Sequence, residues 1–475
     1  MNPVWLAAIP LLAASIAVAD RARRRFWGLL GALLTLVAAL IVCTGPQWQQ
    51  ALGGWPAPLG IVLSMDTLSR VMLLMTAVVG AVVSLYAAAD RNLDHGPFWP
   101  VWLLLWAGMN ALYLSRDLFN LYVGLEIIGL SAVALVTLSG KPVAMRGAMR
   151  YLLVSLTGSL AYLMGVAIVY GLSGTLDMTQ LAEALSANWA AAMALALMTA
   201  GLLAKTALFP LHAWLPPAHA SAPAAVSALL SALVVKASFY LLWRLWAEVF
   251  SVLPMTAAGG LFLLVGAAAV FWGGLQALAT PRLKLLVAWS TVAQLGYLAL
   301  LLGLLARHGD QPVIRSALLL FLIAHATAKA TMFLAAGNFQ RAAGGRDEIT
   351  AIGPAIDRDR MSLFAFGIAG ASLAGLPITG GFLAKWLMLD AAFSLDSSWV
   401  VVVVLLGGLI TAAYTLRVVS TGFAVATHDQ PDPKIEPVPA LMRWATLVLA
   451  LVTVALGLGL GSELAGLDAG LGVDD

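Results

Sequence analysis

The sequence predicts an all-α polytopic membrane protein with about fourteen transmembrane helices. Of its 475 residues, 61% are hydrophobic and only 10% are charged, and the mean hydropathy is +0.94. Soluble domains carry roughly 25% charged residues, so this composition excludes a soluble globular fold. Apolar stretches of the roughly 20 residues that one bilayer crossing requires follow one another along almost the whole chain.

Apolar runs bounded by charged residues, proline or glycine place the individual helices. The first seven lie near residues 3–19, 27–44, 66–89, 98–115, 118–139, 149–172 and 186–209. The second seven lie near residues 220–247, 254–280, 285–305, 312–336, 362–390, 399–425 and 440–460. In the first run the arginines follow the apolar residues, so we interpret it as a membrane helix and not as a signal peptide.

The basic residues outside these spans divide unequally between alternate loops. One set of loops holds sixteen of them: Arg21, Arg23, Arg24, Arg25, Arg91, Lys141, Arg146, Arg150, Arg282, Lys284, Arg341, Arg346, Arg358, Arg360, Lys434 and Arg443. The other set holds four: Arg116, Arg244, Arg307 and Arg315. Cytoplasmic loops are enriched in Lys and Arg, so we expect a multi-pass protein of the inner (cytoplasmic) membrane with both termini on the non-cytoplasmic side.

Several function classes find no support in the sequence. Cys43 is the only cysteine, so disulfides, iron–sulfur ligation and haem attachment through cysteines are excluded. The net charge of +3 argues against nucleic acid as a partner. Nucleotide-binding, metalloprotease and hydrolase motifs are missing, so we expect a transporter subunit without an enzymatic centre, cofactor or metal of its own.

Two of the predicted helices should be interrupted. In the seventh, Pro210 removes a backbone hydrogen bond just after Lys205. In the twelfth, four residues loosen the backbone before Lys385, namely Gly375, Pro377, Gly380 and Gly381. The carbonyl end of a half-helix favours a cation and the amide end disfavours one, so the two lysines are expected to differ in proton affinity.

The two breaks suggest an internal repeat. Helices four to eight and nine to thirteen form two groups of five, and the fourth helix of each group is broken. Five crossings reverse the direction of the chain, so the two groups form an inverted-topology repeat of the kind found in transporters. We predict peripheral helices in 1–97, the first repeat in 98–250, the second in 251–428, and a C-terminal helix and tail in 429–475.

Six basic residues fall inside predicted spans: Arg70, Lys205, Lys236, Lys329, Lys385 and Arg417. A Lys or Arg at a helix centre costs about 2.5 to 3.5 kcal/mol on insertion scales, so such residues usually have a function or a partner. The two arginines lie near helix ends, where long side chains reach the interface. The four lysines are therefore the candidate functional residues.

Glu126 is an acid in an otherwise apolar helix, and its least costly burial is beside a cation. We expect Lys205 to be that partner, either in a proton relay or in a static ion pair. Moving or protonating the carboxylate would switch Lys205 between holding and releasing a proton. His325 and Lys329 are four residues apart on one helix face and could pass protons between lysines. Lys236 is the candidate central relay.

Three further residues are candidates for proton uptake or release. His212 and His219 flank the prolines after the first break, where capping and loop hydrogen bonds are equally good explanations. Asp390 follows Lys385 by five residues, and it either marks a release point or ends the helix at the water interface.

Five segments resemble the antiporter-like subunits of respiratory complex I, membrane-bound hydrogenases and multisubunit Mrp sodium/proton antiporters. They are RDLFNLYVGLEIIGLS, LLAKTALFPLHAWLPPAHASAPAAVSALLSALVVK, LKLLVAWSTVAQLGY, HATAKATMFLAAG and AGLPITGGFLAKW, within residues 60–425. The resemblance implies two linked half-channels, with the family's glutamate–lysine pair, central lysine and terminal lysine at Glu126, Lys205, Lys236 and Lys385.

Within that family, RDLFNLYVGLEI and the short C-terminal region are most similar to the Mrp D-type subunit. The resemblance implies a proton-translocating subunit that assembles with other hydrophobic membrane subunits and moves protons, with sodium as a further candidate ion. Three alternatives stay open: a subunit of a redox-driven proton pump, a stand-alone small-solute symporter, and a membrane partner for carbon dioxide or bicarbonate uptake. Two positions depart from the family pattern: Pro217 replaces a usual acid after WLP, and Leu285 replaces a usual arginine.

Overall fold

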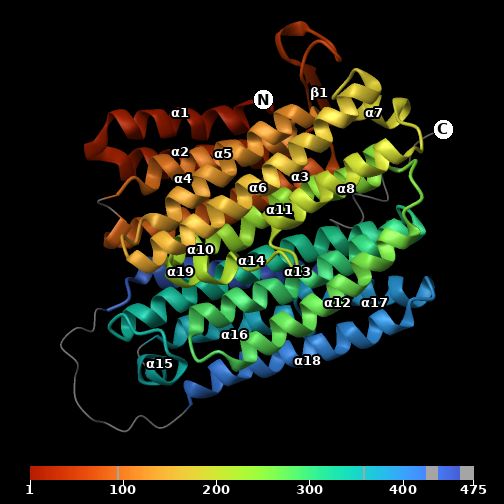
Figure 1. Cartoon of the computed structure of the whole chain (residues 1–475). Coiled ribbons are helices and arrows are strands. Elements are labelled where there is room, and N and C mark those ends of the chain that lie inside the picture. Colours follow the sequence, from red (N-terminus) through yellow and green to blue (C-terminus); the bar gives the residue numbers. More distant parts are fainter. Residues whose placement is uncertain (94–95, 357–358, 424–436, 461–475) are drawn as a thin grey trace.

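The computed structural model describes residues 1–93, 96–356, 359–423 and 437–460, and these form a bundle of apolar helices (Figure 1). Within these ranges, eleven helices are long and apolar enough to cross a membrane. They are α2 (Arg24–Cys43), α3 (Thr67–Ala89), α5 (Leu118–Thr137), α6 (Pro142–Ser173), α8 (Trp189–Thr206), the run from α10 to η5 (Ala224–Val249), α12 (Thr256–Ala279), α13 (Leu283–His308), α14 (Pro312–Ala342), α18 (Ser398–Thr421) and α19 (Ala440–Ala455).

Three shorter apolar helices occupy the remaining predicted positions. They are α1 (Trp5–Ala19), α4 (Phe98–Leu114) and α16 (Arg360–Ala374). The prediction of fourteen spans is therefore confirmed in number and order. The largest boundary errors are at α6 and α14, which extend about two turns beyond the apolar segments on which the prediction rested.

Both predicted helix breaks are present. α8 ends at Thr206, Ala207 takes the left-handed backbone conformation (φ 56°), and the chain resumes as α9 (Leu215–Ser221). α16 ends at Ala374, Gly375 is left-handed (φ 91°), and the chain resumes as α17 (Gly380–Ser394). Gly380 and Gly381 were predicted to loosen the break, but they are instead the first two residues of α17.

The two groups of five helices follow the predicted order. The first group contains α4, α5, α6, the α8/α9 pair and the α10–η5 run, and the second contains α12, α13, α14, the α16/α17 pair and α18. The apolar windows of the α10–η5 run and of α14 are completely buried inside the protein. The centre of the molecule thus lies where these two helices pack between the groups. The predicted domain boundaries remain predictions.

The eighth span is irregular around Lys236. It consists of α10 (Ala224–Leu229), the π-helical segment η4 (Leu230–Val234), α11 (Val235–Arg244) and a second π-helical segment, η5 (Leu245–Val249). Such π-helical turns leave backbone carbonyls out of the regular ladder and are frequent at functional sites. Lys236 is the second residue of α11, directly after the first of them.

Several short elements were not predicted. Strands β1 (Trp48–Ala51) and β2 (Val62–Met65) pair antiparallel in a small hairpin that projects from the bundle (Figure 1). α7 (Met178–Ala184) lies in the loop before α8, and α15 (Ile349–Ile356) precedes α16. Three 3-10 turns, η1 (Arg21–Arg23), η2 (Leu52–Gly54) and η3 (Arg91–Leu93), lie in loops, and the π-helical segment η6 (Leu456–Leu460) follows α19. We call the two ends of the bundle the hairpin end and the α15 end.

Four charged residues join three segments at the hairpin end. Asp66, which caps α3, accepts hydrogen bonds from Arg116 (3.1 Å) and Arg244 (2.6 Å), and Glu248 accepts from the same two arginines. Burial opposes ionisation of Asp66, but the guanidinium groups of Arg244 and Arg116 outweigh it and hold the pKa of Asp66 below its usual range. The stabilisation is therefore present at neutral pH and is lost as the pH falls through that lowered pKa.

Replacing Asp66 with Asn should destabilise the protein. The Arg244 side chain is only 3% exposed and would lose one of its two carboxylate partners, at a cost of about 1–3 kcal/mol. Thermal unfolding of the detergent-purified protein would measure the effect. The control is D310N, because Asp310 pairs with Arg315 in an exposed ion pair that should contribute little. Equal Tm values for D66N and D310N would contradict the stabilising role of the Asp66 ion pairs.

Candidate functional site

Lys205 and Glu126 form an ion pair between α8 and α5. The Lys205 ammonium donates to Glu126 Oε1 at 3.0 Å and to Ser155 Oγ at 3.1 Å, and Ser159 donates to the same Glu126 oxygen. The Lys205 side chain is 5% exposed and that of Glu126 21%. The structure thus brings together the two residues that the sequence predicted to be partners.

The broken helix explains the position of Lys205. It lies in the last turn of α8, where the carbonyl end of the helix favours a positive charge. The Trp214 indole donates to the carbonyl of Ala204 at 2.8 Å, which also accepts from the backbone N–H of Ala207 at the end of the helix. Tyr151 of α6 stacks on Trp214 with ring centroids 4.0 Å apart and holds the indole in place.

Lys236 and Lys329 lie near the centre and are both fully buried. The Lys236 ammonium donates to the carbonyl of Ser231, and the Lys329 ammonium donates to Ser290 Oγ and, at 3.2 Å, to the carbonyl of Val287. Within the described ranges neither lysine forms an ion pair with a carboxylate. Among the described residues, a backbone carbonyl solvates Lys236, and a carbonyl and a hydroxyl group solvate Lys329.

Hydrogen bonds of two hydroxyl groups lie between the residues that contact these two lysines. Ser231 and Thr291 share a hydrogen bond of 2.9 Å, and Thr291 donates to the Val287 carbonyl that also accepts from Lys329. These residues were not predicted as functional from the sequence, because Ser and Thr are common in membrane helices. The signal that could have identified them is their spacing, since Val287 and Thr291 are one helical turn apart on α13.

The histidines occupy different surroundings. His325 is 1% exposed, one turn from Lys329, and neither of its ring nitrogens has a hydrogen-bond partner among the described residues. His219 is fully buried and stacks on Phe333 with centroids 4.9 Å apart. The sequence offered His219 as a candidate for proton uptake or for capping and loop hydrogen bonds. The structure places its side chain in the interior, and the uptake role remains a prediction.

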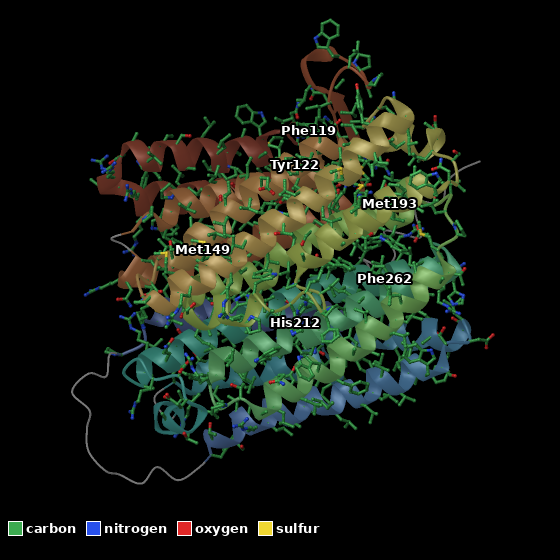
Figure 2. The ribbon with its side chains drawn as sticks, viewed as in Figure 1. Phe119, Tyr122, Met149, Met193, His212 and Phe262 are labelled. Atoms are coloured by element: carbon green, nitrogen blue, oxygen red, sulfur yellow. The ribbon has the colours of Figure 1, made fainter. Side chains whose placement is uncertain are left out.

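His212 lies in the segment between α8 and α9, about midway between the two ends of the bundle (Figure 2). Its ring stacks on Phe209 at 5.3 Å and meets Trp289 of α13 edge-on at 5.6 Å. Asp390 is exposed on α17. Both positions are compatible with the predicted uptake or release roles, which remain predictions.

Lys385 lies near the start of α17 and points back across the helix break. Its ammonium donates to the carbonyls of Leu373 at 2.7 Å and Ala374 at 3.3 Å, and lies 4.4 Å from the centre of the Tyr297 ring. The position of Lys385 after the break predicted that it lies beside the unfavourable amide end of the second half-helix. That expectation was wrong, because the long side chain reaches the carbonyl end of α16 instead.

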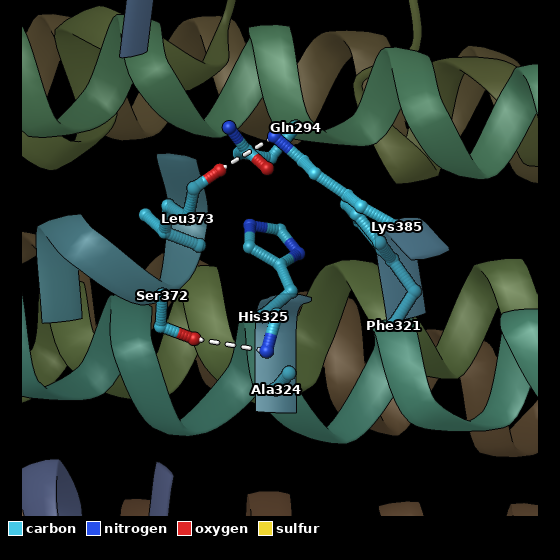
Figure 3. A pocket seen from close by; sticks show the side chains of 8 residues that line it. Gln294, Phe321, Ala324, His325, Ser372, Leu373 and Lys385 are labelled. Carbon is cyan, nitrogen blue, oxygen red and sulfur yellow. Dashed lines mark hydrogen bonds between the residues drawn. The ribbon is translucent and has the colours of Figure 1, made fainter. Parts of the chain in front are cut away.

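A small pocket joins Lys385 to His325 (Figure 3). It contains about 180 Å³ of empty space, most of it too narrow for solvent, with room for at most about one water molecule. Its lining comes from α13, α14, α16 and α17 and comprises Gln294, Phe321, Ala324, His325, Ser372, Leu373, Gly381 and Lys385. The polar side chains that face it offer a water the two or more partners that it needs.

The two remaining charged residues predicted in spans lie near helix ends. Arg417 of α18 donates to the carbonyls of Leu278 and Thr280, where α12 ends. Arg70 lies in the first turn of α3. The interpretation of Arg417 as an end-of-helix residue is confirmed by its contacts.

The chain matches the family model of NADH:quinone oxidoreductase/Mrp antiporter transmembrane proteins over residues 115–411. It is 34% identical to NADH-quinone oxidoreductase subunit N of Desulforudis audaxviator over 89% of this chain and 85% of the relative. It is 30% identical to the D-type Na(+)/H(+) antiporter subunit of Alkalihalophilus pseudofirmus over 87% and 83% of the two chains. The solved Mrp complex from Dietzia sp. DQ12-45-1b contains a chain that is 26% identical, with a TM-score of 0.87 and coverage of 99% of this chain and 97% of that chain.

Gly381 should be intolerant of even the smallest side chain. A Cβ at this position would lie 1.9 Å from the backbone oxygen of Ser372, so α16 and α17 would have to separate beside the pocket. We expect G381A to cost about 1–3 kcal/mol or more, measured as a lower Tm of the purified protein. G367A on α16 is the control, since the nearest atom to its Cβ would lie 3.9 Å away. A Tm for G381A equal to that of G367A would exclude this close packing.

Proposed function

Because the chain belongs to the NADH:quinone oxidoreductase/Mrp antiporter transmembrane family, we propose that it is the proton-translocating, D-type subunit of a multisubunit cation/proton antiporter. Protons move along a row of buried groups: Glu126, Lys205, Lys236, His325, Lys329 and Lys385. The observation that carries the proposal is the Glu126–Lys205 ion pair at a helix break, followed by buried lysines without carboxylate partners among the described residues.

The chemistry of this row favours protons over metal cations. Amines and imidazoles bind a proton covalently, whereas a charged ammonium repels a second cation nearby. An ammonium in an apolar interior is costly unless it is paired or hydrogen-bonded. A proton on one lysine beyond Lys205 therefore disfavours a proton on the adjacent groups, so that arrival of one proton displaces the next. A sodium ion coupled to this movement would cross through another subunit.

Glu126 controls the first member of the row. Its carboxylate balances the Lys205 charge, so moving or protonating it removes that balance and releases a proton toward Lys236. The water-sized pocket between His325 and Lys385 serves the last transfer, because one water can link the imidazole to the amine.

The surroundings follow from the same proposal. The chain lies in the cytoplasmic membrane with its α15 end toward the cytoplasm and both termini on the other side, as the distribution of basic loop residues predicts. It has no redox or hydrolytic centre of its own and draws energy through its partner subunits. The similarity to subunit N favours a second candidate, a proton-pumping subunit of a redox-driven complex.

Substituting Glu126 with Gln should stop transport without preventing assembly. The neutral amide keeps the size and the hydrogen-bond acceptor for Lys205 but removes the balancing charge, so we expect proton movement to fall roughly tenfold or more. The assay uses everted membrane vesicles containing the complete complex, with a pH-sensitive dye read after addition of NaCl or KCl.

The matched control is E183Q, which removes an exposed carboxylate in α7. Native gels report assembly of each variant. Wild-type transport by E126Q, or a wild-type complex that moves no protons with either salt, would refute the proposed function.

The identity of the partner subunits separates the two candidates. We expect native mass spectrometry of the purified complex to find several small hydrophobic subunits and no bound flavin. Flavin-containing or iron–sulfur subunits in stoichiometric amounts would assign the chain to a redox-driven pump instead.

A further inference from the structure

Lys284 is buried, although its loop position in the sequence predicted a solvated residue. It is the second residue of α13, at the α15 end, and is 3% exposed. Its ammonium donates a hydrogen bond to the carbonyl of Ala222, the residue at which α9 ends. The side chain thus extends from the end of α13 into the junction between α9 and α10.

An ion pair lies at the start of α13, close to Lys284 in the chain. Arg282 and Asp347 form a salt bridge of 3.0 Å, and the backbone N–H of Leu283 donates to the Asp347 carbonyl at 2.7 Å. The Asp347 carboxylate attracts the Lys284 ammonium over a longer distance, whereas Arg282 and Lys141 repel it. Among the described residues, Lys284 has no carboxylate in direct contact.

His219 lies near Lys284, because it precedes the hydrogen-bonded Ala222 by less than one helical turn. This histidine precedes Ala222 by three residues in α9, and neither ring nitrogen has a partner in the described part of the chain. Lys284 acts on His219 electrostatically, as do Lys329 and Lys236. His219 also stacks on Phe333, which lies one helical turn from Lys329 on α14. The three basic groups therefore lie in the order Lys284, His219, Lys329 from the α15 end to the centre.

We propose that Lys284 is a proton-relay residue at the α15-end mouth of the transport path, and that it delivers protons to His219 and from there to Lys329. This inference rests on the proposed function and adds an inlet to it. The Lys284 amine takes a proton from water at the α15 end and becomes an ammonium. That ammonium passes the proton, through a water molecule, to an unprotonated ring nitrogen of His219 and returns to the neutral amine.

The hydrogen bond to the Ala222 carbonyl does not by itself explain why residue 284 is an ionisable lysine. A hydroxyl or amide would satisfy the Ala222 carbonyl without the desolvation cost of a buried charge. Likewise, His219 has two polar ring nitrogens in a fully buried site and no hydrogen-bond partner in the described residues. A histidine in that position is useful when it exchanges protons with a neighbour.

Two substitutions retain the hydrogen bond to Ala222 and remove the relay. K284R keeps the positive charge but cannot release its proton, because arginine stays protonated in proteins. K284Q keeps an N–H donor, but its amide is neutral and does not take up or release a proton at neutral pH. We expect both variants to assemble and to reduce dye-detected proton movement in everted vesicles by roughly tenfold or more.

The control is R91M, which removes an exposed positive charge from the same end of the bundle and has no interaction with Lys284 in the described residues. Wild-type rates in either K284R or K284Q would overturn the relay, because a capping or purely electrostatic role would survive one of these changes. E126Q is measured alongside. If E126Q is inactive while the Lys284 variants are normal, the proposed function stands and only the inlet is wrong.

Discussion

The dominant physical constraint in this protein is the cost of a positive charge in an apolar interior. Four lysines lie within the predicted membrane spans, yet among the described residues only Lys205 of these four has a carboxylate in contact. The others are held by carbonyls and hydroxyls that the fold brings to them. A buried positive charge whose desolvation cost is only partly offset is unfavourable in a static structure. A group that must gain and lose a proton needs such a partly offset charge, because a fully stabilised charge would not release its proton.

The irregular backbone supplies much of this solvation. Lys205 lies in the last turn of the first half of one broken helix, and the Lys385 ammonium reaches back to the carbonyl end of the first half of the other. Lys236 donates to a carbonyl within a π-helical turn. The breaks and bulges thus give charged groups acceptors that a regular helix would use internally.

The buried basic residues Arg244 and Lys284, at opposite ends of the bundle, are paired differently. At the hairpin end, Arg116 and Arg244 each form ion pairs with both Asp66 and Glu248. Each of these four charges therefore has two partners, and the ion pairs link the segments that carry them. At the α15 end, Lys284 is buried with a single carbonyl as its acceptor. A fully paired network suits a closed, rigid end, whereas a sparsely paired amine suits an end through which protons enter.

The sequence by itself determined the number and order of the membrane helices, both breaks and the Glu126–Lys205 partnership. These follow from hydropathy, from proline and glycine chemistry, and from the need to neutralise the one carboxylate predicted deep within an apolar helix. Only the tertiary structure decided which carbonyls and hydroxyls solvate the other lysines, that Lys385 reaches back to α16, and that His219 and Lys284 are buried. These contacts join residues far apart in the chain, and a long flexible lysine can reach either side of a break. Periodicity and local composition therefore cannot select its partner, whereas the packing of neighbouring helices does.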